Sequence, residues 1–160
     1  MKYIIGVADM KISAQPGDQL VTYALGSCLG ITIHDPVAHV GGLLHVMLPL
    51  STIDPAKATE NPSMFVDTGV PRLFLACYQI GAQKQRLIVK VAGGASVHGD
   101  KVDDHFQIGK RNLVMLRKLL WKNGVLLQAQ DVGGSHSRTL TLIIGSGEVT
   151  LKTQGGSAIL

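Results

Sequence analysis

Turn-forming residues divide much of the chain into short apolar runs, and this pattern restricts the possible folds more than any other feature of the sequence. Short runs bounded by Gly, Pro, Asn or Asp are typical of β-strands. The pattern predicts strands over residues 3–8, 19–25, 29–34, 40–48, 86–92, 125–131, 139–144 and 147–153. The last two meet at Gly145-Ser146, which is typical of a hairpin turn.

Two longer segments have apolar residues at helical spacing. Residues 64–80 predict a helix that stops at Gly81, and Pro71 implies either a later start or a kink, because proline removes a backbone donor. Residues 108–122 predict a second helix with leucines along one side. Two helices and about eight strands indicate an α+β fold, a single layered domain over residues 1–160 with mixed or antiparallel sheets.

Composition limits the class of protein further. With 160 residues, of which 46% are hydrophobic and 4% aromatic, the chain can bury an aliphatic core without disulfides or a metal. Two cysteines do not make a disulfide framework, and the N-terminal apolar stretch is too short for a signal peptide. The uncharged runs at 19–34 and 36–53 contain polar residues, so neither predicts a membrane span. We expect a cytoplasmic protein that does not insert into membranes.

The formal net charge of +4 permits an acidic partner without identifying one. Basic residues gather on and near the helix predicted at 108–122, where only Phe106 and Trp121 could stack on nucleic-acid bases. Charge runs usually face water, so we interpret this cluster as a solvated helix face. We therefore expect no nucleic-acid partner. The cluster comprises Lys101, Lys110, Arg111, Arg117, Lys118 and Lys122.

Cys28, followed by His45 on the next predicted strand, is the feature that suggests chemistry. With Asp35 beginning a type I turn, an antiparallel hairpin puts Cys28 directly opposite His45, with Cβ atoms about 4.5–5.5 Å apart. An imidazole can take the thiol proton, and an adjacent imidazolium lowers the pKa of a cysteine. Thr22 on the preceding strand can accept a hydrogen bond from the other ring nitrogen.

Alternation in this hairpin separates the two faces of the ribbon. Leu29, Ile31 and Ile33 share the face that we expect to be the core side, whereas Cys28 and His45 share the other. The residues around Cys28 predict an oxyanion or substrate loop with backbone N–H groups free to bind an oxyanion. The members of this predicted loop are Gly26, Ser27 and Gly30.

Each of these residues also has a simpler interpretation. Cys28 can be a small buried hydrophobe, and Cys77, inside a helical apolar stripe, is interpreted as structural. Ser27 lacks the G-x-S-x-G context of a nucleophilic serine. The glycine pairs 93–94 and 133–134 predict tight strand ends rather than phosphate loops. We expect no metal and no cofactor, since none of the remaining histidines has ligand spacing: His34, His39, His98, His105 and His136.

The segments TYALGSCLGITIHDP at 22–36 and GGLLHVMLP at 41–49 resemble the signature of the CheD family of chemoreceptor glutamine deamidases. The resemblance continues through Asp67-Thr68, AGGA at 92–95, IGKRN at 108–112, DVGG at 131–134, Arg138 and Gly147. It implies a protein-glutamine glutaminase of bacterial or archaeal chemotaxis, with Cys28 as nucleophile, His45 as base and Thr22 as its partner. It also implies an α/β/β fold similar to the catalytic domain of the cytotoxic necrotizing toxins.

The resemblance further implies partners. The substrates are methyl-accepting chemoreceptors, and some family members also hydrolyse receptor methyl esters. CheC, a phosphatase of the response regulator, is a known partner in the family, so the alternative function is a non-catalytic regulator that binds such a phosphatase. We expect a monomer that recognises an exposed receptor helix across a shallow surface. That surface is predicted to comprise the mobile, loop-like stretch 51–63 and the glycine-rich rims 93–99 and 133–137.

Overall fold

The computed structural model describes residues 1–96 and 107–160, within which ten strands form two five-stranded sheets. The first sheet has the strand order β1 (Lys2–Ile4), β3 (Gln19–Leu25), β8 (Arg138–Ile143), β9 (Val149–Thr153) and β10 (Gly156–Ile159). The second has the order β2 (Asp9–Ser13), β5 (Val40–Val46), β4 (Leu29–Asp35), β6 (Ile88–Gly93) and β7 (Leu127–Val132). Both sheets are mixed, because β1 pairs with β3, and β6 with β7, in parallel.

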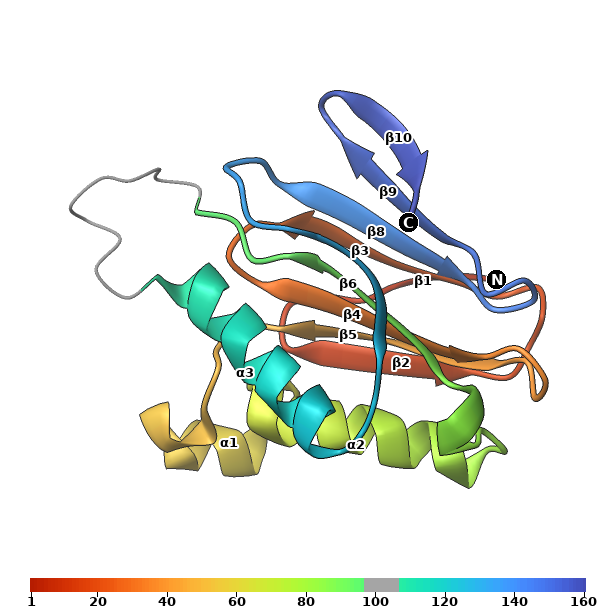
Figure 1. Ribbon diagram of the computed structural model, residues 1–160, viewed down its shortest axis with the longest axis horizontal. Helices are drawn as coiled ribbons and strands as arrows, with labels where there is room; N and C mark the ends of the chain where they lie inside the picture. Colours follow the sequence, from red (N-terminus) through yellow and green to blue (C-terminus); the bar gives the residue numbers. More distant parts are fainter. Residues whose placement is uncertain (97–106) are drawn as a thin grey trace.

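The elements lie in three layers (Figure 1). Helices α2 (Val66–Gln79) and α3 (Ile108–Lys122) cover one face of the second sheet, and the first sheet covers its other face. Among the described residues, no helix has the length and apolar character that crossing a membrane requires. The predicted α+β class with mixed sheets and two main helices is confirmed.

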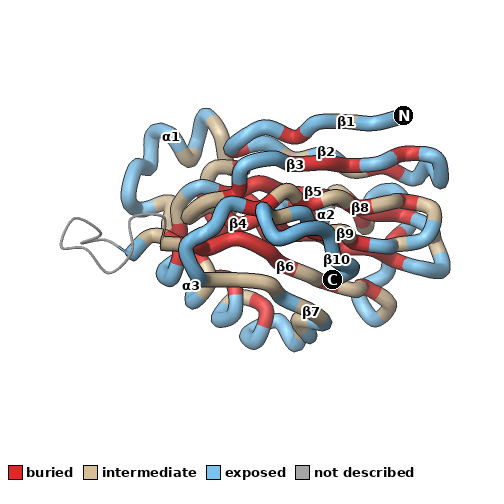
Figure 2. Tube along the Cα trace, turned by 90° about the horizontal axis from the view of Figure 1, so that it is seen from above, coloured by how far each residue is buried: buried red, intermediate tan, exposed pale blue. Residues whose placement is uncertain are grey.

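Both faces of the central strands are buried. Every residue of β4 and β5 is buried, which Figure 2 shows as continuous runs through the middle of the molecule. The predicted core face, which carries Leu29, Ile31 and Ile33, packs against the helices. The opposite face, with Leu43, packs against Leu140 and its neighbours in the first sheet. His45 lies on this second face, so its surroundings are the interior between two sheets and not an open ribbon surface.

The N-terminal strand differs from its prediction. Residues 3–8 do not form one strand; β1 ends at Ile4, and the chain then crosses to the other sheet to begin β2 at Asp9. Ala8 has a positive φ of 59° at this crossing, which interrupts extended backbone. Strand β2, which was not predicted, pairs with β5 and extends the sheet that carries His45. Its exposed Asp9 and Lys11 alternate with the half-buried Met10 and Ile12, the pattern of a strand with one covered face.

The stretch predicted as a loop at 51–63 is largely helical, so that prediction is wrong. It contains a 3-10 turn (Ser51–Ile53), helix α1 (Pro55–Glu60) and a second 3-10 turn (Pro62–Met64). Both prolines occupy first helical turns, where a missing N–H costs nothing, and the Asp54 side chain accepts from Lys57 N–H as an N-cap. Helix α2 begins at Val66, before Pro71, so the alternative of a start at the proline is also wrong.

The β4–β5 hairpin has a different register from the predicted one. Asp35 pairs with Val40, and Gly30, not Cys28, lies directly opposite His45. The turn therefore contains residues 36–39, because the Asp35 carboxylate accepts from the Val37 and Ala38 N–H groups at 2.9 and 3.1 Å while Asp35 itself stays in the strand. The correction is two residues, so every side chain keeps its predicted face.

Asp35 also anchors the hairpin to the segment before β6. The carboxylate is fully buried and accepts from Gln83 N–H at 2.9 Å and from the Arg86 guanidinium at 2.8–2.9 Å. Burial alone would raise the pKa of Asp35, but the hydrogen bonds from Arg86 and from backbone N–H groups outweigh it and hold the pKa well below the usual range.

We predict that Asp35→Asn lowers the free energy of unfolding by about 3 kcal/mol at pH 7, because it removes the charge from a buried, fully paired site. The stabilisation from the ionised carboxylate is fully present above its ordinary pKa of 3.8 and is lost as the pH falls toward the lower folded-state pKa. Urea unfolding should therefore show the difference between variant and wild type shrinking below pH 3.8. Asp9→Asn, at an exposed position, is the control; a pH-independent difference would contradict the account.

Candidate active site

The three residues predicted to carry the chemistry come from both sheets and from the segment that joins them. Thr22 lies on β3 of the first sheet and His45 on β5 of the second, and their exposed fractions are 0% and 1%. Cys28 lies in the bend between β3 and β4, where the chain passes from one sheet to the other. Its side chain is half-buried, so solvent still reaches this position.

A hydrogen bond between Thr22 and His45 crosses the interface between the sheets. Thr22 Oγ1 lies 2.6 Å from His45 Nδ1 and 2.8 Å from the carbonyl oxygen of Ile5. A carbonyl oxygen can only accept, and a hydroxyl has one proton to donate. Thr22 therefore donates to Ile5, and the 2.6 Å contact requires that His45 Nδ1–H donates to Thr22. The second ring nitrogen, Nε2, then carries the lone pair.

His45 Nε2 is the free end of this chain of hydrogen bonds. Within the described residues it is buried and has no hydrogen-bond partner. Burial lowers the pKa of His45 below its ordinary value of 6.5, because the charged ring is poorly solvated there. At neutral pH the ring is therefore neutral, with an unused basic nitrogen. A group in this state can accept a proton as a general base.

The thiol is not strongly activated in the resting site. Burial raises the pKa of Cys28, and a hydrogen bond from its own backbone N–H only partly offsets this effect. No hydrogen bond joins the Cys28 thiol to His45 in the part of the chain that the structure describes. The two pKa directions favour a neutral thiol and a neutral ring, in contrast to the thiolate beside an imidazolium that the sequence suggests.

The residues that follow β6 hold the segment around Cys28 through backbone hydrogen bonds. The N–H groups of Gly94 and Ala95 donate to the carbonyl oxygens of Cys28 and Gly26, both at 2.9 Å. A Cβ at Gly93 would collide with the Cys28 carbonyl oxygen, so a glycine is required at this close approach. Gly93 and Gly94 therefore end a strand tightly, as predicted, and Gly133 follows the end of β7.

The remaining members of the predicted oxyanion or substrate loop lie in two different environments. Gly26 and Ser27 are half-buried beside Cys28. Gly30 is buried within β4, where a Cβ would lie 2.8 Å from Leu140 Cδ2 and 2.9 Å from Leu25 Cδ1. Packing between the sheets, and not the approach of a substrate, explains the glycine at position 30.

Two polar residues near this segment have roles that sequence reasoning missed. Arg138, 4% exposed, donates to Asp131 at 2.8 Å and to the Gly133 carbonyl at 2.8 Å, which fixes the turn beside the end of β6. Asn112, fully buried on α3, donates to the Ser27 carbonyl at 3.0 Å. The sequence did contain one indication that Asn112 is unusual. It lies four residues before Leu116, so its polar amide is on the apolar face of the helix.

The other candidates are not part of this site. Cys77 is buried in the core between α2 and the second sheet, which confirms its structural interpretation. His34 is buried and contacts the Ile144 carbonyl at 2.7 Å. Residues 1–96 and 107–160 contain no group of three or more His, Cys, Asp or Glu side chains arranged to hold a metal. His98 and His105 lie outside the described residues.

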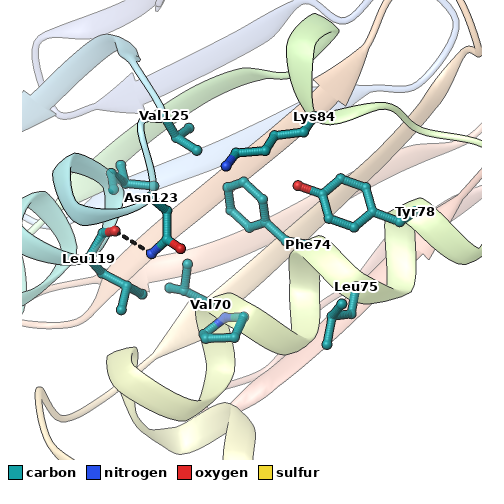
Figure 3. Close-up of a pocket in the computed structure, with 10 residues that line it drawn as sticks. Val70, Phe74, Leu75, Tyr78, Lys84, Leu119, Asn123 and Val125 are labelled. Atoms are coloured by element: carbon teal, nitrogen blue, oxygen red, sulfur yellow. Dashed lines mark hydrogen bonds between the residues drawn. The ribbon is translucent and has the colours of Figure 1, made fainter.

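The exposed basic residues of α3 confirm a solvated helix face for the described part of that cluster; Lys101 lies outside it. A pocket of about 300 Å³ lies between α2 and α3, and none of the three site residues lines it. Figure 3 shows this pocket. Apolar side chains such as Phe74, Leu119 and Val125 line it, with the polar ends of Lys84 and Tyr78 at its side.

Fold and site together define a class of protein: two packed sheets with an outer helical layer, a His45–Thr22 hydrogen bond that joins the sheets, and Cys28 in the bend where the chain passes from β3 to β4. The family model described as CheD chemotactic sensory transduction matches residues 47–153. The chain belongs to the CheD family, which confirms the resemblance in its sequence.

Three relatives illustrate the extent of the similarity. The chain is 52% identical over 153 residues to the probable chemoreceptor glutamine deamidase CheD 1 of Syntrophus aciditrophicus, covering 96% of this chain and 94% of the relative. It is 53% identical to a probable chemoreceptor glutamine deamidase CheD of Solibacter usitatus, over 95% and 89% of the two chains. The corresponding protein of Thermococcus kodakarensis is 34% identical, over 100% and 98%.

We predict that iodoacetamide labels Cys28 and not Cys77 in the folded protein, because Cys77 is fully buried and its pKa is raised to about 12. Since burial raises the pKa of Cys28, its alkylation rate should still be rising between pH 7 and pH 9. Peptide mass spectrometry after timed labelling measures both. A rate that is already constant below pH 7 would show a preformed thiolate and contradict the neutral pair.

Proposed function

We propose that this chain is a chemoreceptor glutamine deamidase that converts glutamine side chains of methyl-accepting chemoreceptors to glutamate. The observation that carries the proposal is the neutral His45 ring, whose Nδ1 is committed to Thr22 and whose buried Nε2 has no partner among the described residues. Gly30, two residues after the half-buried Cys28, pairs with His45. The relatives above, named probable chemoreceptor glutamine deamidases, supply the substrate class.

The chemistry follows the acyl-transfer pattern of a cysteine nucleophile. Cys28 sulfur attacks the carboxamide carbon of glutamine while His45 Nε2 takes the thiol proton. The carbonyl oxygen becomes an oxyanion, which the Cys28 backbone N–H can bind. His45 then protonates the departing nitrogen, the C–N bond breaks, and ammonia leaves a thioester.

Hydrolysis of the thioester completes the cycle. His45, neutral again, takes a proton from water as the water oxygen attacks the thioester carbon. The C–S bond breaks, the thiol recovers its proton from His45, and the product is glutamate. Thr22 keeps Nδ1 protonated in both halves, so the ring always presents Nε2 to the reaction.

Substrate recognition on this proposal uses a shallow surface around Cys28. A groove of about 290 Å³ lies between the chain after β5 and the start of α3, and two of its residues are cationic. Its lining residues are Pro49, Leu50, Gln107, Lys110, Arg111, Val114 and Met115. The helical stretch 51–63 and the exposed turn 133–137 flank it on our proposal. Of the rim predicted at 93–99, residues 97–99 lie outside the described residues.

The wider expectations also belong to this proposal. We infer a single domain over residues 1–160, a cytoplasmic monomer without a nucleic-acid partner, and a three-layer fold of the kind found in the cytotoxic necrotizing toxins. A CheC-type phosphatase is the proposed protein partner. The alternative function, a binding regulator without turnover, predicts that loss of Cys28 leaves every measurable activity intact.

We predict that incubation with cytoplasmic fragments of chemoreceptors converts specific glutamines to glutamates, detected by peptide mass spectrometry. Cys28→Ala should abolish the conversion, because no nucleophile remains to form the thioester. Cys77→Ala, the same change at a buried cysteine remote from Thr22 and His45, should retain it. Conversion by Cys28→Ala at the wild-type rate would contradict the proposed enzyme mechanism. If wild type binds the phosphatase but converts no glutamine, the binding regulator is favoured instead.

A further inference from the structure

Three consecutive carbonyl oxygens around the proposed nucleophile each accept a hydrogen bond, and only the middle one is held by a side chain. The backbone N–H groups of Ala95 and Gly94, which follow β6, donate to the Gly26 and Cys28 carbonyls. The Ser27 carbonyl instead accepts from Asn112 Nδ2 at 3.0 Å. The orientation of the peptide between Ser27 and Cys28 is therefore controlled by one side chain from a different layer of the fold.

The Asn112 side chain connects two segments of the chain through hydrogen bonds. Its amide nitrogen also donates to the Met47 carbonyl at 3.1 Å, two residues beyond His45, so it ties the nucleophile segment to the end of the strand that carries the base. Helix α3 reaches this position because Gly109, one turn earlier, lies against the backbone of Gly94, where a Cβ would be only 2.6 Å away.

The amide oxygen shows that packing alone does not account for this residue. Asn112 is fully buried, and its Oδ1 has no hydrogen-bond partner in the described structure. A buried acceptor without a partner is unfavourable, and an apolar side chain of the same size would avoid the cost. Asn112 donates both of its hydrogen bonds to backbone carbonyl oxygens, so its NH₂ group is the part of the side chain that contacts the segment around Cys28.

The consequence of holding the Ser27 carbonyl follows from peptide geometry. In a trans peptide the C=O of one residue and the N–H of the next point in opposite directions. With Ser27 C=O directed at α3, the Cys28 N–H is directed away from α3. Among the described residues no backbone carbonyl accepts from it. An N–H beside the nucleophile that no carbonyl oxygen engages can serve as the donor to an oxyanion.

We propose that Asn112 is a positioning residue, which by holding the Ser27 carbonyl aims the Cys28 N–H at the oxyanion formed when Cys28 attacks a carboxamide. The inference rests on the proposed deamidase function and adds a specific determinant of its rate. Asn112 does not touch the substrate; it acts through the Ser27–Cys28 peptide.

The test is Asn112→Leu, which keeps the side-chain size and removes both donated bonds. Deamidation kcat should fall by up to about 10²-fold with little change in KM, because the affected donor acts on the oxyanion and not on bound glutamine. Alkylation of Cys28 by iodoacetamide at a pH where the thiol is ionised should stay at the wild-type rate, since that reaction forms no oxyanion. A merely structural role would slow both reactions together.

Asn123→Leu is the matched control, the same substitution at the exposed end of the same helix, where Asn123 donates only to its own turn at Leu119 (Figure 3). It should leave both rates unchanged. Wild-type kcat in Asn112→Leu, a loss confined to KM, or equal losses of deamidation and alkylation would each overturn the proposal. Failure of wild type itself to deamidate would instead count against the proposed function.

If Asn112→Leu does not fold, a measurement on the wild-type protein still tests the proposal. A receptor peptide with an aldehyde in place of the glutamine carboxamide forms a tetrahedral adduct with the thiol. In ¹⁵N-labelled protein the Cys28 amide proton should move downfield on adduct formation, as it donates to the new oxygen. An unmoved Cys28 amide signal in the formed adduct would overturn the proposal.

Discussion

The hydrogen bond from His45 to Thr22 is the interaction on which the rest of this structure depends. It joins two different sheets, so its 2.6 Å length holds only while β3 and β5 keep their relative positions. Leu25, Leu43 and Leu140 pack between the sheets and maintain that spacing. A close-packed interior of this kind moves little, and the ring therefore keeps one orientation and one tautomer.

The position of the proposed nucleophile, Cys28, follows from a change of sheet. Strand β3 belongs to one sheet and β4 to the other, and the register of β3 against β8 shifts between Thr22 and Leu25, where Ala24 has a positive φ of 55°. Such irregularities often lie next to active sites because they redirect the chain. Here the irregularity releases Cys28 from the buried ladders that contain Thr22 and His45. His45 is thus buried between the sheets, while Cys28 is only half-buried.

Sequence reasoning predicted the strand faces around the proposed site better than the register of its strands. Alternation predicted the faces of β4 and β5 correctly, because a register error of two residues leaves every side chain on its face. It misplaced Cys28 relative to His45 because the Asp35 carboxylate forms its own turn with Val37 and Ala38, an interaction that no apolar pattern records.

Contacts between segments far apart in the chain could not be predicted from apolar patterns in the sequence. Apolar alternation did not reveal that a second sheet covers the His45 face, so neither the burial of His45 nor the packing role of Gly30 was predicted. The roles of Asn112 and Arg138 depend on contacts between segments far apart in the chain. Helix α1, by contrast, could have been predicted, because Asp54 followed by Pro55 is a typical helix start. The two prolines of this stretch were instead interpreted as typical of a loop.

The central claim, that His45 is a neutral base with its proton on Nδ1, is tested most directly by ¹⁵N NMR of the histidine ring. At pH 7 the account predicts a protonated Nδ1 and an unprotonated Nε2 for His45, with a ring pKa below 6.5. A proton on Nε2, or an imidazolium at pH 7, would contradict it.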